Sequence, residues 1–332
     1  MEWTADTAAG DWVRERLDDE WTIHHFVPRG FGAYARIFHP VERDRPVGRP
    51  WPPLPYGRHR KEWDAFQSAQ PEFDAERVSW ADAAAAFGTT MHATAQWHHL
   101  VEKFQQVQGE DGPRDAAGWR YGQPRLGQLP ADLVSVVASI LEAHTTTPDD
   151  AFLAIWEGWG GLVGGMGYGP SRVLFTLSAT DDSPRSAEAA QHAEFLERSA
   201  HDQLENAFRK PTWQPGILSD DISQGPRLRL PDRDHVLFHG SLDELAAADW
   251  EERMPWRDES PRQFGQPPTA ESPSLLWPAD HEWIVASEVD YDSTIVGGSH
   301  AAIRAVCADP RLEALPIREG ADLTWDADEV NR

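Results

Sequence analysis

A hairpin pattern in the C-terminal half of the chain is the sequence feature that most constrains the fold. In "PRLRLPDRDHVLFHGS", Leu228 and Leu230 alternate with Arg227 and Arg229, and the apolar run "HVLFHG" returns after a turn at 231–233. Alternation with a period of two is typical of a strand that buries one face. A short turn between two such runs joins antiparallel strands. The chain is therefore predicted to contain an antiparallel sheet.

The remaining apolar runs extend this prediction to the rest of the chain. Further strands are predicted at 21–27, 32–39, 171–180 and 282–290, from residue 150, and near 313–317. Helices are predicted at 79–88, 91–107, 131–145, 184–208, 241–250 and 299–308. Strands and helices mix without the sustained β–α–β alternation of a doubly wound fold. We therefore expect the α+β class, with mixed, mainly antiparallel sheets and packed helices.

Two of these helices have recognisable starts, and one has a recognisable end. Ser79 stands three residues before Asp82, and Ser241 stands three residues before Glu244, a spacing that favours a helix N-terminal cap. Gly88 is placed to end the first of these two helices.

Two segments rich in glycine and proline suggest how the chain is divided. Residues 44–60 contain five prolines and predict a loop with polyproline character, and residues 108–130 are the best candidate for a boundary. We expect an N-terminal α+β portion at 1–115, a C-terminal α+β portion at 130–318 and an acidic tail at 319–332. One integrated domain is the alternative.

Composition excludes several classes of function. Fifty-five acidic residues face 30 basic ones, for a formal net charge of −25, so the surface repels phosphate backbones and nucleic-acid binding is disfavoured. No run approaches the ~18 apolar residues of a membrane span, and the acidic N-terminus lacks the apolar region of a signal peptide. Cys307 is the single cysteine, so an intrachain disulfide and a cysteine-based zinc site are excluded. We expect a bacterial, cytoplasmic protein that uses no cofactor and has no membrane partner.

The sixteen tryptophans are numerous for 332 residues. Each buries roughly 150–250 Å² when it enters a core, so most are expected to be buried or partly buried. A minority on the surface is expected to serve as platforms for a ligand.

The segment "EWIVASEVDYDSTIVGGS" places three acids at the end of a predicted strand. Because side chains alternate between faces, Glu288, Asp290 and Asp292 should line one face with neighbours ~7 Å apart. Such a row can hold a divalent cation or activate a water molecule. A structural interpretation is favoured instead, in which the acids pair with Arg227 and Arg229 across the sheet.

The same interpretation gives local uses to the residues that follow. Asp292 and Ser293 would bond backbone amides in a turn, Gly297 and Gly298 would adopt positive φ, and Ser299 would cap the next helix.

Within this segment, "DYDST" resembles the first motif of haloacid-dehalogenase-type phosphatases. The resemblance would make Asp290 the nucleophile and Asp292 the acid–base group. That family also needs a later lysine and a longer sheet, whereas 40 residues follow Asp292 and none is lysine. The Asp-x-Asp of nucleotide-sugar transferases is a second resemblance that lacks its structural context.

A glycine-dense loop provides the candidate ligand-binding residues. In "IWEGWGGLVGGMGYGPSR", Trp156, Trp159 and Tyr168 could stack on a flat ligand, with Glu157 and Arg172 as polar contacts. No lysine follows the glycines and the next element is a predicted strand, so a phosphate-binding loop is disfavoured.

The fourteen histidines and Cys307 do not form a recognisable site. No three or four ligands have metal-binding spacing, so structural histidines and an absence of bound metal are expected. Cys307 lies in the apolar run "AAIRAVC" and is expected to be a buried, inert thiol.

The segment "LLWPADHEWIVASEVDYDSTIVGGSHAAIRAVCADPRLEALPI" resembles the C-terminal signature, LWPADxxW…DxDSTxVGGS, of a family of actinobacterial proteins. "GFGAYARIFHP", "WADAAAAFG" and "DHVLFHGSLDEL" are similar to segments of the same proteins. The resemblance implies a bacterial cytoplasmic protein with one integrated fold, and it assigns no activity or catalytic residue. "FLAIWEGWGG" is also similar to a segment of immunity-type cytosolic proteins.

These observations favour an acidic, tryptophan-rich protein with a binding or regulatory role and no chemistry of its own. The first alternative is a metal-assisted hydrolase or transferase that uses Glu288, Asp290 and Asp292. The second is an immunity-like or DNA-mimic protein that binds a basic protein partner.

Overall fold

The computed structural model describes residues 1–101, 112–167 and 210–332. The chain forms two compact units, of which the first comprises Met1–Glu157 and Pro226–Arg332 and the second Gly158–Gly225. Helices occur together with mainly antiparallel sheets, which confirms the predicted α+β class. The predicted strand at 171–180 and the predicted helix at 184–208 lie outside the described residues.

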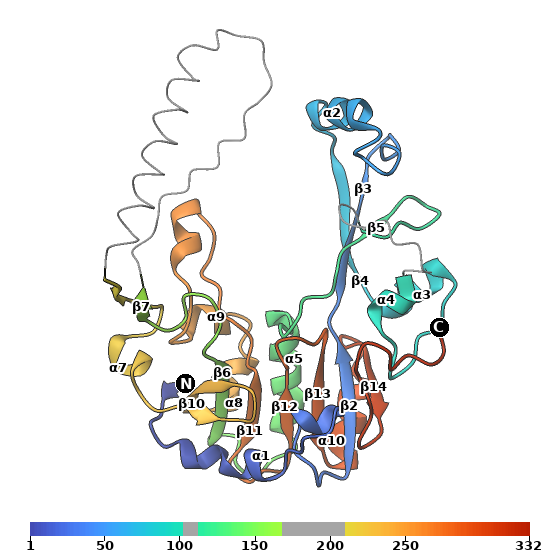
Figure 1. The fold of residues 1–332 in the computed structure, drawn as a ribbon. Coiled ribbons are helices and arrows are strands. Elements are labelled where there is room, and N and C mark those ends of the chain that lie inside the picture. Colours follow the sequence, from blue (N-terminus) through green and yellow to red (C-terminus); the bar gives the residue numbers. More distant parts are fainter. Residues whose placement is uncertain (102–111, 168–209) are drawn as a thin grey trace. The chain divides into compact units, whose positions relative to one another are not determined.

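Among the described residues, a nine-stranded sheet forms the centre of the first unit (Figure 1). Its strands are β1 (Glu2–Trp3), β2 (Ala33–Phe38), β6 (Ala151–Trp156), β9 (Leu228–Arg229), β10 (Asp234–Gly240), β11 (Leu275–Pro278), β12 (Ile284–Ala286), β13 (Ser293–Gly298) and β14 (Ala314–Ile317). Their order is β1-β10-β6-β11-β12-β13-β2-β14, and β9 pairs with β10. Every one of these pairings is antiparallel.

The predicted hairpin is present as β9 and β10. His235 lies opposite Leu228, and Asp234 lies opposite Arg229. The apolar run of β10 is fully buried at Val236, Leu237 and Phe238, because the strand lies in the interior of the sheet.

Strand β2 connects the N-terminal and C-terminal parts of the chain. It pairs with β13 on one side, where Phe38 lies opposite Ser293, and with β14 on the other, where Ile37 lies opposite Ala314. Residues from both predicted portions, 1–115 and 130–318, therefore contribute to one sheet.

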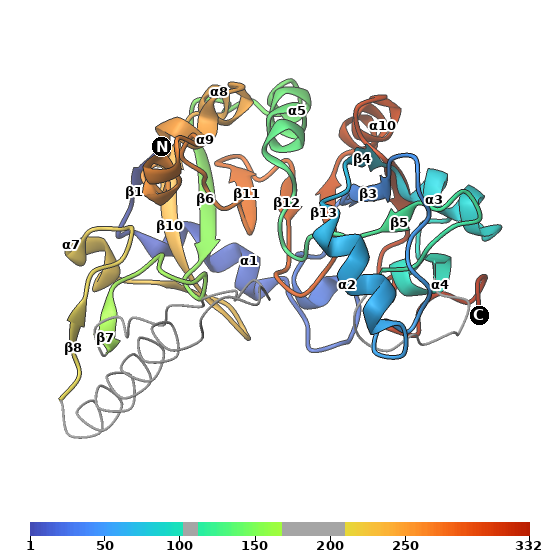
Figure 2. The ribbon, with the colours of Figure 1, turned by 90° about the horizontal axis from the view of Figure 1, so that it is seen from above.

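Three helices lie side by side along one face of this sheet (Figure 2). They are α5 (Ala131–Glu142), α8 (Leu242–Ala246) and α10 (His300–Ala308), and the short helix α9 (Trp250–Arg253) packs against α5 and α8. Helix α5 buries Leu133, Val137 and Leu141, which recur every four residues and so occupy one stripe of the helix. None of the helices in the described part of the chain has the length and apolar character needed to cross a membrane.

The opposite face carries the second half of the core and is covered by the N-terminal segment. This segment contains η1 (Thr7–Gly10), α1 (Asp11–Glu15) and η2 (Ile23–His25). Leu275 and Trp277 of β11 belong to this core cluster, whereas Leu276 between them does not, as the alternation of a strand requires. Val13 and Ile23 of the covering segment are fully buried against it.

A smaller sheet completes the first unit. It contains β4 (Phe73–Val78), β3 (Val41–Pro46) and β5 (Arg120–Tyr121), in that order. The associated helices are α2 (Arg60–Ser68), α3 (Trp80–Phe87) and α4 (Trp97–Val101). The predicted cap of α3 is confirmed, since the Ser79 hydroxyl accepts a hydrogen bond from the Asp82 amide at 3.0 Å and Gly88 has φ +69°.

The second unit is small in its described part. Strands β7 (Gly165–Gly167) and β8 (Thr212–Gln214) pair antiparallel, and α7 (Asp220–Ser223) follows with Ser219 as its cap.

Two strand predictions differ from the structure in their extent. Residues 21–27 contain the 3₁₀ helix η2 rather than a strand, because Thr22 accepts from the His24 amide and starts a turn. The predicted strand at 282–290 ends at Ala286, and the chain then turns with the Tyr291 amide donating to the Glu288 carbonyl at 3.0 Å. The 3₁₀ helix η3 (Ser260–Phe264) lies between α9 and β11.

The two glycines ahead of α10 have a different role from the predicted one. Gly297 and Gly298 are residues of β13 and do not have positive φ. The lack of room for a side chain explains why residue 297 is glycine, since a Cβ there would lie 2.7 Å from the Phe31 ring. The predicted cap at Ser299 is confirmed, because its hydroxyl accepts from the Ala302 amide at 3.2 Å.

A glycine outside the strands fixes the loop that follows β12. Gly127 has φ +64°, its amide donates to the Tyr291 carbonyl at 2.8 Å, and a Cβ there would lie 2.5 Å from Val289 Cα. Gly118 has a similar φ of +83° with nothing within 4 Å of its would-be Cβ.

These two glycines give a matched test of the close approach. Gly118→Ala should destabilise the protein by about 1–2 kcal/mol, the cost of a left-handed conformation for alanine. Gly127→Ala should cost about 1–3 kcal/mol more, because overpacking is added. Urea unfolding measures both changes, and equal losses would show that the approach to Val289 is not a tight one.

Candidate functional site

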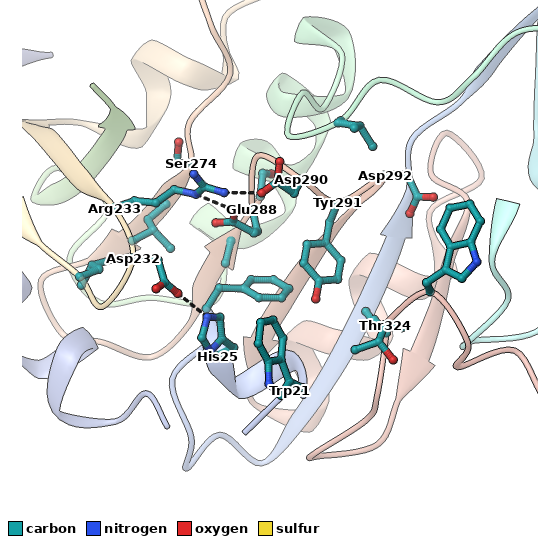
Figure 3. Close-up of a pocket in the computed structure, with 18 of the residues that line it drawn as sticks. Trp21, His25, Asp232, Arg233, Ser274, Glu288, Asp290, Tyr291, Asp292 and Thr324 are labelled. Atoms are coloured by element: carbon teal, nitrogen blue, oxygen red, sulfur yellow. Dashed lines mark hydrogen bonds and ion pairs between the residues drawn. The ribbon is translucent and has the colours of Figure 1, made fainter. Parts of the chain in front are cut away.

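A cavity of about 880 Å³ opens beside the loop that follows β12 (Figure 3). Segments from distant parts of the first unit line it. They include residues near η2, residues 96–98, residues 123–126, the turn before β10, the loop at 286–292 and residues 323–325. Its volume lies in the range of sites for small organic molecules.

Two tryptophans at this cavity are exposed to solvent. Trp21 is 74% exposed and Trp325 is 70% exposed, whereas the other fourteen tryptophans are buried or partly buried. Both line the same cavity. Trp21 stacks on His25 with ring centroids 5.4 Å apart, and Trp325 stacks on His98 at 3.5 Å. The prediction that a minority of the tryptophans lies on the surface is met by these two residues.

The C-terminal segment that carries Trp325 is anchored by a buried carboxylate. Asp328 is fully buried and accepts hydrogen bonds from the His92 ring at 2.9 Å, the Gln96 amide and the Asn331 amide. Burial alone would raise the pKa of Asp328, but the hydrogen bonds from Asn331, Gln96 and His92 outweigh it and lower that pKa to about 2.

Arg233 organises the polar side of the cavity. Its Nε donates to Glu288 at 2.7 Å, its Nη2 donates to Asp290, and its guanidinium lies 4.8 Å from the Trp156 ring centroid. Figure 3 shows the side chain extending toward both carboxylates. Asp232, the preceding residue, pairs with the His25 ring. Burial is the main cause of a raised pKa at Glu288, and the hydrogen bond from Arg233 opposes it.

Asp292 forms an ion pair with a buried arginine of the central sheet. Arg36 of β2 is fully buried and donates to Asp292 at 3.1 Å and to the Ser293 hydroxyl at 2.8 Å. It also donates to the Ala95 carbonyl at 2.7 Å, and its guanidinium lies over the Phe38 ring at 4.5 Å. Burial raises the pKa of Asp292 and lowers that of Arg36, while the attraction between them opposes both changes.

Neutral and unpaired nitrogens complete the lining. Burial lowers the pKa of His98 and of His235 to about 4, so both are neutral at pH 7. Within residues 1–101, 112–167 and 210–332, no hydrogen-bond partner exists for His235 Nδ1 or Trp97 Nε1. Each of these side chains is at most 4% exposed, and both residues line the cavity.

The structure brings the three predicted acids to one cavity with partners other than those expected. Glu288, Asp290 and Asp292 all line it. Arg227, an expected partner, instead binds Glu157 at 2.8 Å. The expected pairing with Arg227 and Arg229 assumed a strand continuing past Ala286. Because the chain turns there, Glu288 and Asp290 meet Arg233 instead.

Asp292 and Ser293 also have a side-chain partner that the sequence did not predict. Both residues bind the side chain of Arg36, in addition to any bonds they make to backbone amides.

The predicted ligand-binding set lies in different parts of the chain. Trp156 and Glu157 belong to the first unit, near Arg233 and Arg227 respectively. Trp159 belongs to the second unit. Tyr168 and Arg172 lie outside the described residues, so this set stays a prediction.

Sequence reasoning missed Trp21, Trp325 and Arg233, which line the cavity, and Arg36, which pairs with Asp292. Trp21 and Trp325 stand among acids, in "DDEWTI" and "TWDADE", and this setting signals exposure. Arg36 interrupts the apolar strand "AYARIF", which is a signal of a buried, paired charge. The sequence places Arg233 in the hairpin turn and gives no signal of a functional role.

The described part of the chain contains no group of three or more His, Cys, Asp or Glu side chains arranged to hold a metal ion. At this cavity the reason is visible, because the guanidinium groups of Arg233 and Arg36 occupy the carboxylates that a metal would need. Cys307 is half-buried, and burial raises the pKa of its thiol.

Comparison with known proteins finds no matching family model, no matching curated protein and no matching solved structure.

The buried ion pair predicts a large loss of stability when one partner is removed. Arg36→Met should lower the free energy of unfolding by about 3–5 kcal/mol, because Asp292 then keeps a mostly buried charge without its counterion. Urea unfolding measures the change. Arg36→Met/Asp292→Asn should lose less than the sum of the two single losses.

Arg45→Met is the matched control for this test. Arg45 pairs with Asp74 on the surface, where both side chains are about half exposed, so the loss should stay below about 1 kcal/mol. An Arg36→Met loss as small as that of Arg45→Met would contradict the account of the buried pair.

Asp328 predicts a dependence of stability on acid pH. Its folded pKa of about 2 lies below the unfolded value of about 3.9, so the stabilisation is complete above the unfolded value and is lost as pH falls toward 2. The stability difference between the wild type and Asp328→Asn should therefore shrink between about pH 5 and pH 2. The exposed neighbour variant Asp326→Asn serves as the control, and a difference for Asp328→Asn that is constant with pH would refute the assignment.

Proposed function

We propose that the protein binds a small organic ligand in the cavity beside the 286–292 loop and performs no chemistry on it. The observation that carries this proposal is the position of the exposed tryptophans. Only two of sixteen are mostly exposed, and both line this cavity. An exposed indole leaves a large apolar area in water, and aromatic rings at the mouth of a cavity are suited to stacking on a flat ligand.

The lining of the cavity matches that of small-molecule sites. Apolar and aromatic side chains such as Phe26, Leu230 and Tyr291 form much of the wall, and a few polar groups converge from Arg233 and the neighbouring acids. Sites of this kind combine a largely apolar wall with a small number of orienting polar groups.

The pairing of the acids supports binding over catalysis. Glu288 and Asp290 share Arg233, and Asp292 is held by Arg36, so each carboxylate has a structural partner. The metal-assisted hydrolase or transferase therefore ranks below the binding role. The immunity-like or DNA-mimic alternative and its basic partner rest on the net charge of −25 and the sequence resemblance alone, and the cytoplasmic location remains a proposal from the sequence.

A neutral fluorescent probe tests the proposal. N-phenyl-1-naphthylamine fluoresces more strongly in apolar sites and is small enough for about 880 Å³. Its titration should saturate with the wild type. Trp21→Ala/Trp325→Ala should weaken the affinity about tenfold or more, because two stacking surfaces are lost.

The control is Phe264→Ala, which removes an aromatic ring that is 77% exposed and does not line the cavity. This variant should bind the probe as the wild type does. The proposal fails if the probe does not saturate, or if all of these proteins bind it equally.

A further inference from the structure

We propose that the ligand is a small organic cation with a flat aromatic body, whose positive group lies between Asp232 and Asp290. This inference rests on the proposed binding function and adds the chemical class of the ligand.

The charge of the cavity is the first argument. Four carboxylates line it, those of Asp232, Glu288, Asp290 and Asp292, against the one guanidinium of Arg233. Arg36 lies behind Asp292 and neutralises that acid. The lining therefore carries an excess of negative charge, which attracts a cation and opposes the entry of an anion.

Exposure locates this excess within the cavity. Glu288 is mostly buried, with 18% of its side chain exposed, and it accepts a hydrogen bond from Nε of Arg233. Asp290 and Asp232 have 74% and 62% of their side chains exposed. A ligand cation can approach the exposed parts of these two carboxylates, which also contact Arg233 and His25, while Arg233 keeps Glu288 as its partner.

Two of the histidines that line the cavity do not oppose a cation. His98 and His235 are neutral at pH 7, because burial lowers the pKa of each to about 4. His25 already contacts Asp232 through its ring nitrogen. The positive group of a ligand must therefore avoid the guanidinium of Arg233. This guanidinium lies against Glu288, on one side of the cavity.

Independent features point to an aromatic body. The exposed faces of Trp21 and Trp325 suit both ring stacking and cation–π contact. His235 lines the cavity and is 4% exposed, and its Nδ1 has no hydrogen-bond partner among the described residues. A buried nitrogen without a partner calls for an explanation, and a ligand in the cavity would provide one.

Three naphthalene probes of one shape and different charge test the class of ligand. They are 1-naphthylmethylamine, which is a cation at pH 7, the neutral 1-naphthalenemethanol and the anionic 1-naphthoate. Each is used to displace N-phenyl-1-naphthylamine from the intact protein. The cation should displace it at a concentration about tenfold or more below that of the alcohol, and the anion should be the weakest. Added salt should reduce this preference.

Variants locate the positive group. Asp232→Asn/Asp290→Asn should remove most of the preference for the cation, measured as the ratio of the concentrations at which the alcohol and the cation displace the parent probe. Asp74→Asn/Asp249→Asn changes the net charge equally at two surface acids outside the cavity and should keep the preference.

The outcomes separate this inference from the proposed function. If the parent probe does not bind, the proposed function fails. If the probe binds but the cation and the alcohol displace it equally, the inference alone is overturned. N-acetyl-lysine amide, which has the charge without the ring, should displace about tenfold less well than the naphthyl cation. Equal displacement would also overturn the inference and would indicate a basic side chain of a partner protein.

Discussion

The cavity depends on the buried contact between Arg36 and Asp292. The arginine lies in β2 and the aspartate directly precedes β13, so the pair joins residues that are far apart in sequence across one strand pairing. Arg36 also donates a hydrogen bond to the Ala95 carbonyl, and this bond positions the segment that leads to Trp97 and His98. A buried ion pair gives little net stability compared with an apolar replacement, but losing one partner is costly. In this protein the pair places one wall of the cavity relative to another.

A second arginine sets the charge that a ligand meets. Arg233 stands at the end of the hairpin turn and takes Glu288 as a partner, with Asp290 beside it. The aromatic surfaces come from elsewhere, since Trp21 precedes η2 and Trp325 lies in the C-terminal segment anchored by Asp328. The cavity thus combines parts from both ends of the chain.

The sequence predicted local features well and long-range pairings poorly. The β9–β10 hairpin, the Ser79 and Ser299 caps and the left-handed Gly88 follow from patterns within a few residues. The end of β12 at Ala286 does not follow from the local pattern, because the alternation of side chains through Glu288 and Asp290 fits a continuing strand as well as a loop. The deciding contacts come from Gly127 and Arg233, which are remote in sequence. The sequence pattern identifies the three acids, whereas their partners follow only from the fold.

Fluorine NMR of protein labelled with 5-fluorotryptophan tests the central claim most directly, since each of the sixteen tryptophans gives one resonance. Substitution assigns the resonances of Trp21 and Trp325, and 1-naphthylmethylamine is then titrated. The account predicts that these two resonances shift in parallel with one dissociation constant and that those of deeply buried tryptophans such as Trp250 do not move. Saturable shifts at other tryptophans with Trp21 and Trp325 unchanged, or no shifts at all, would contradict it.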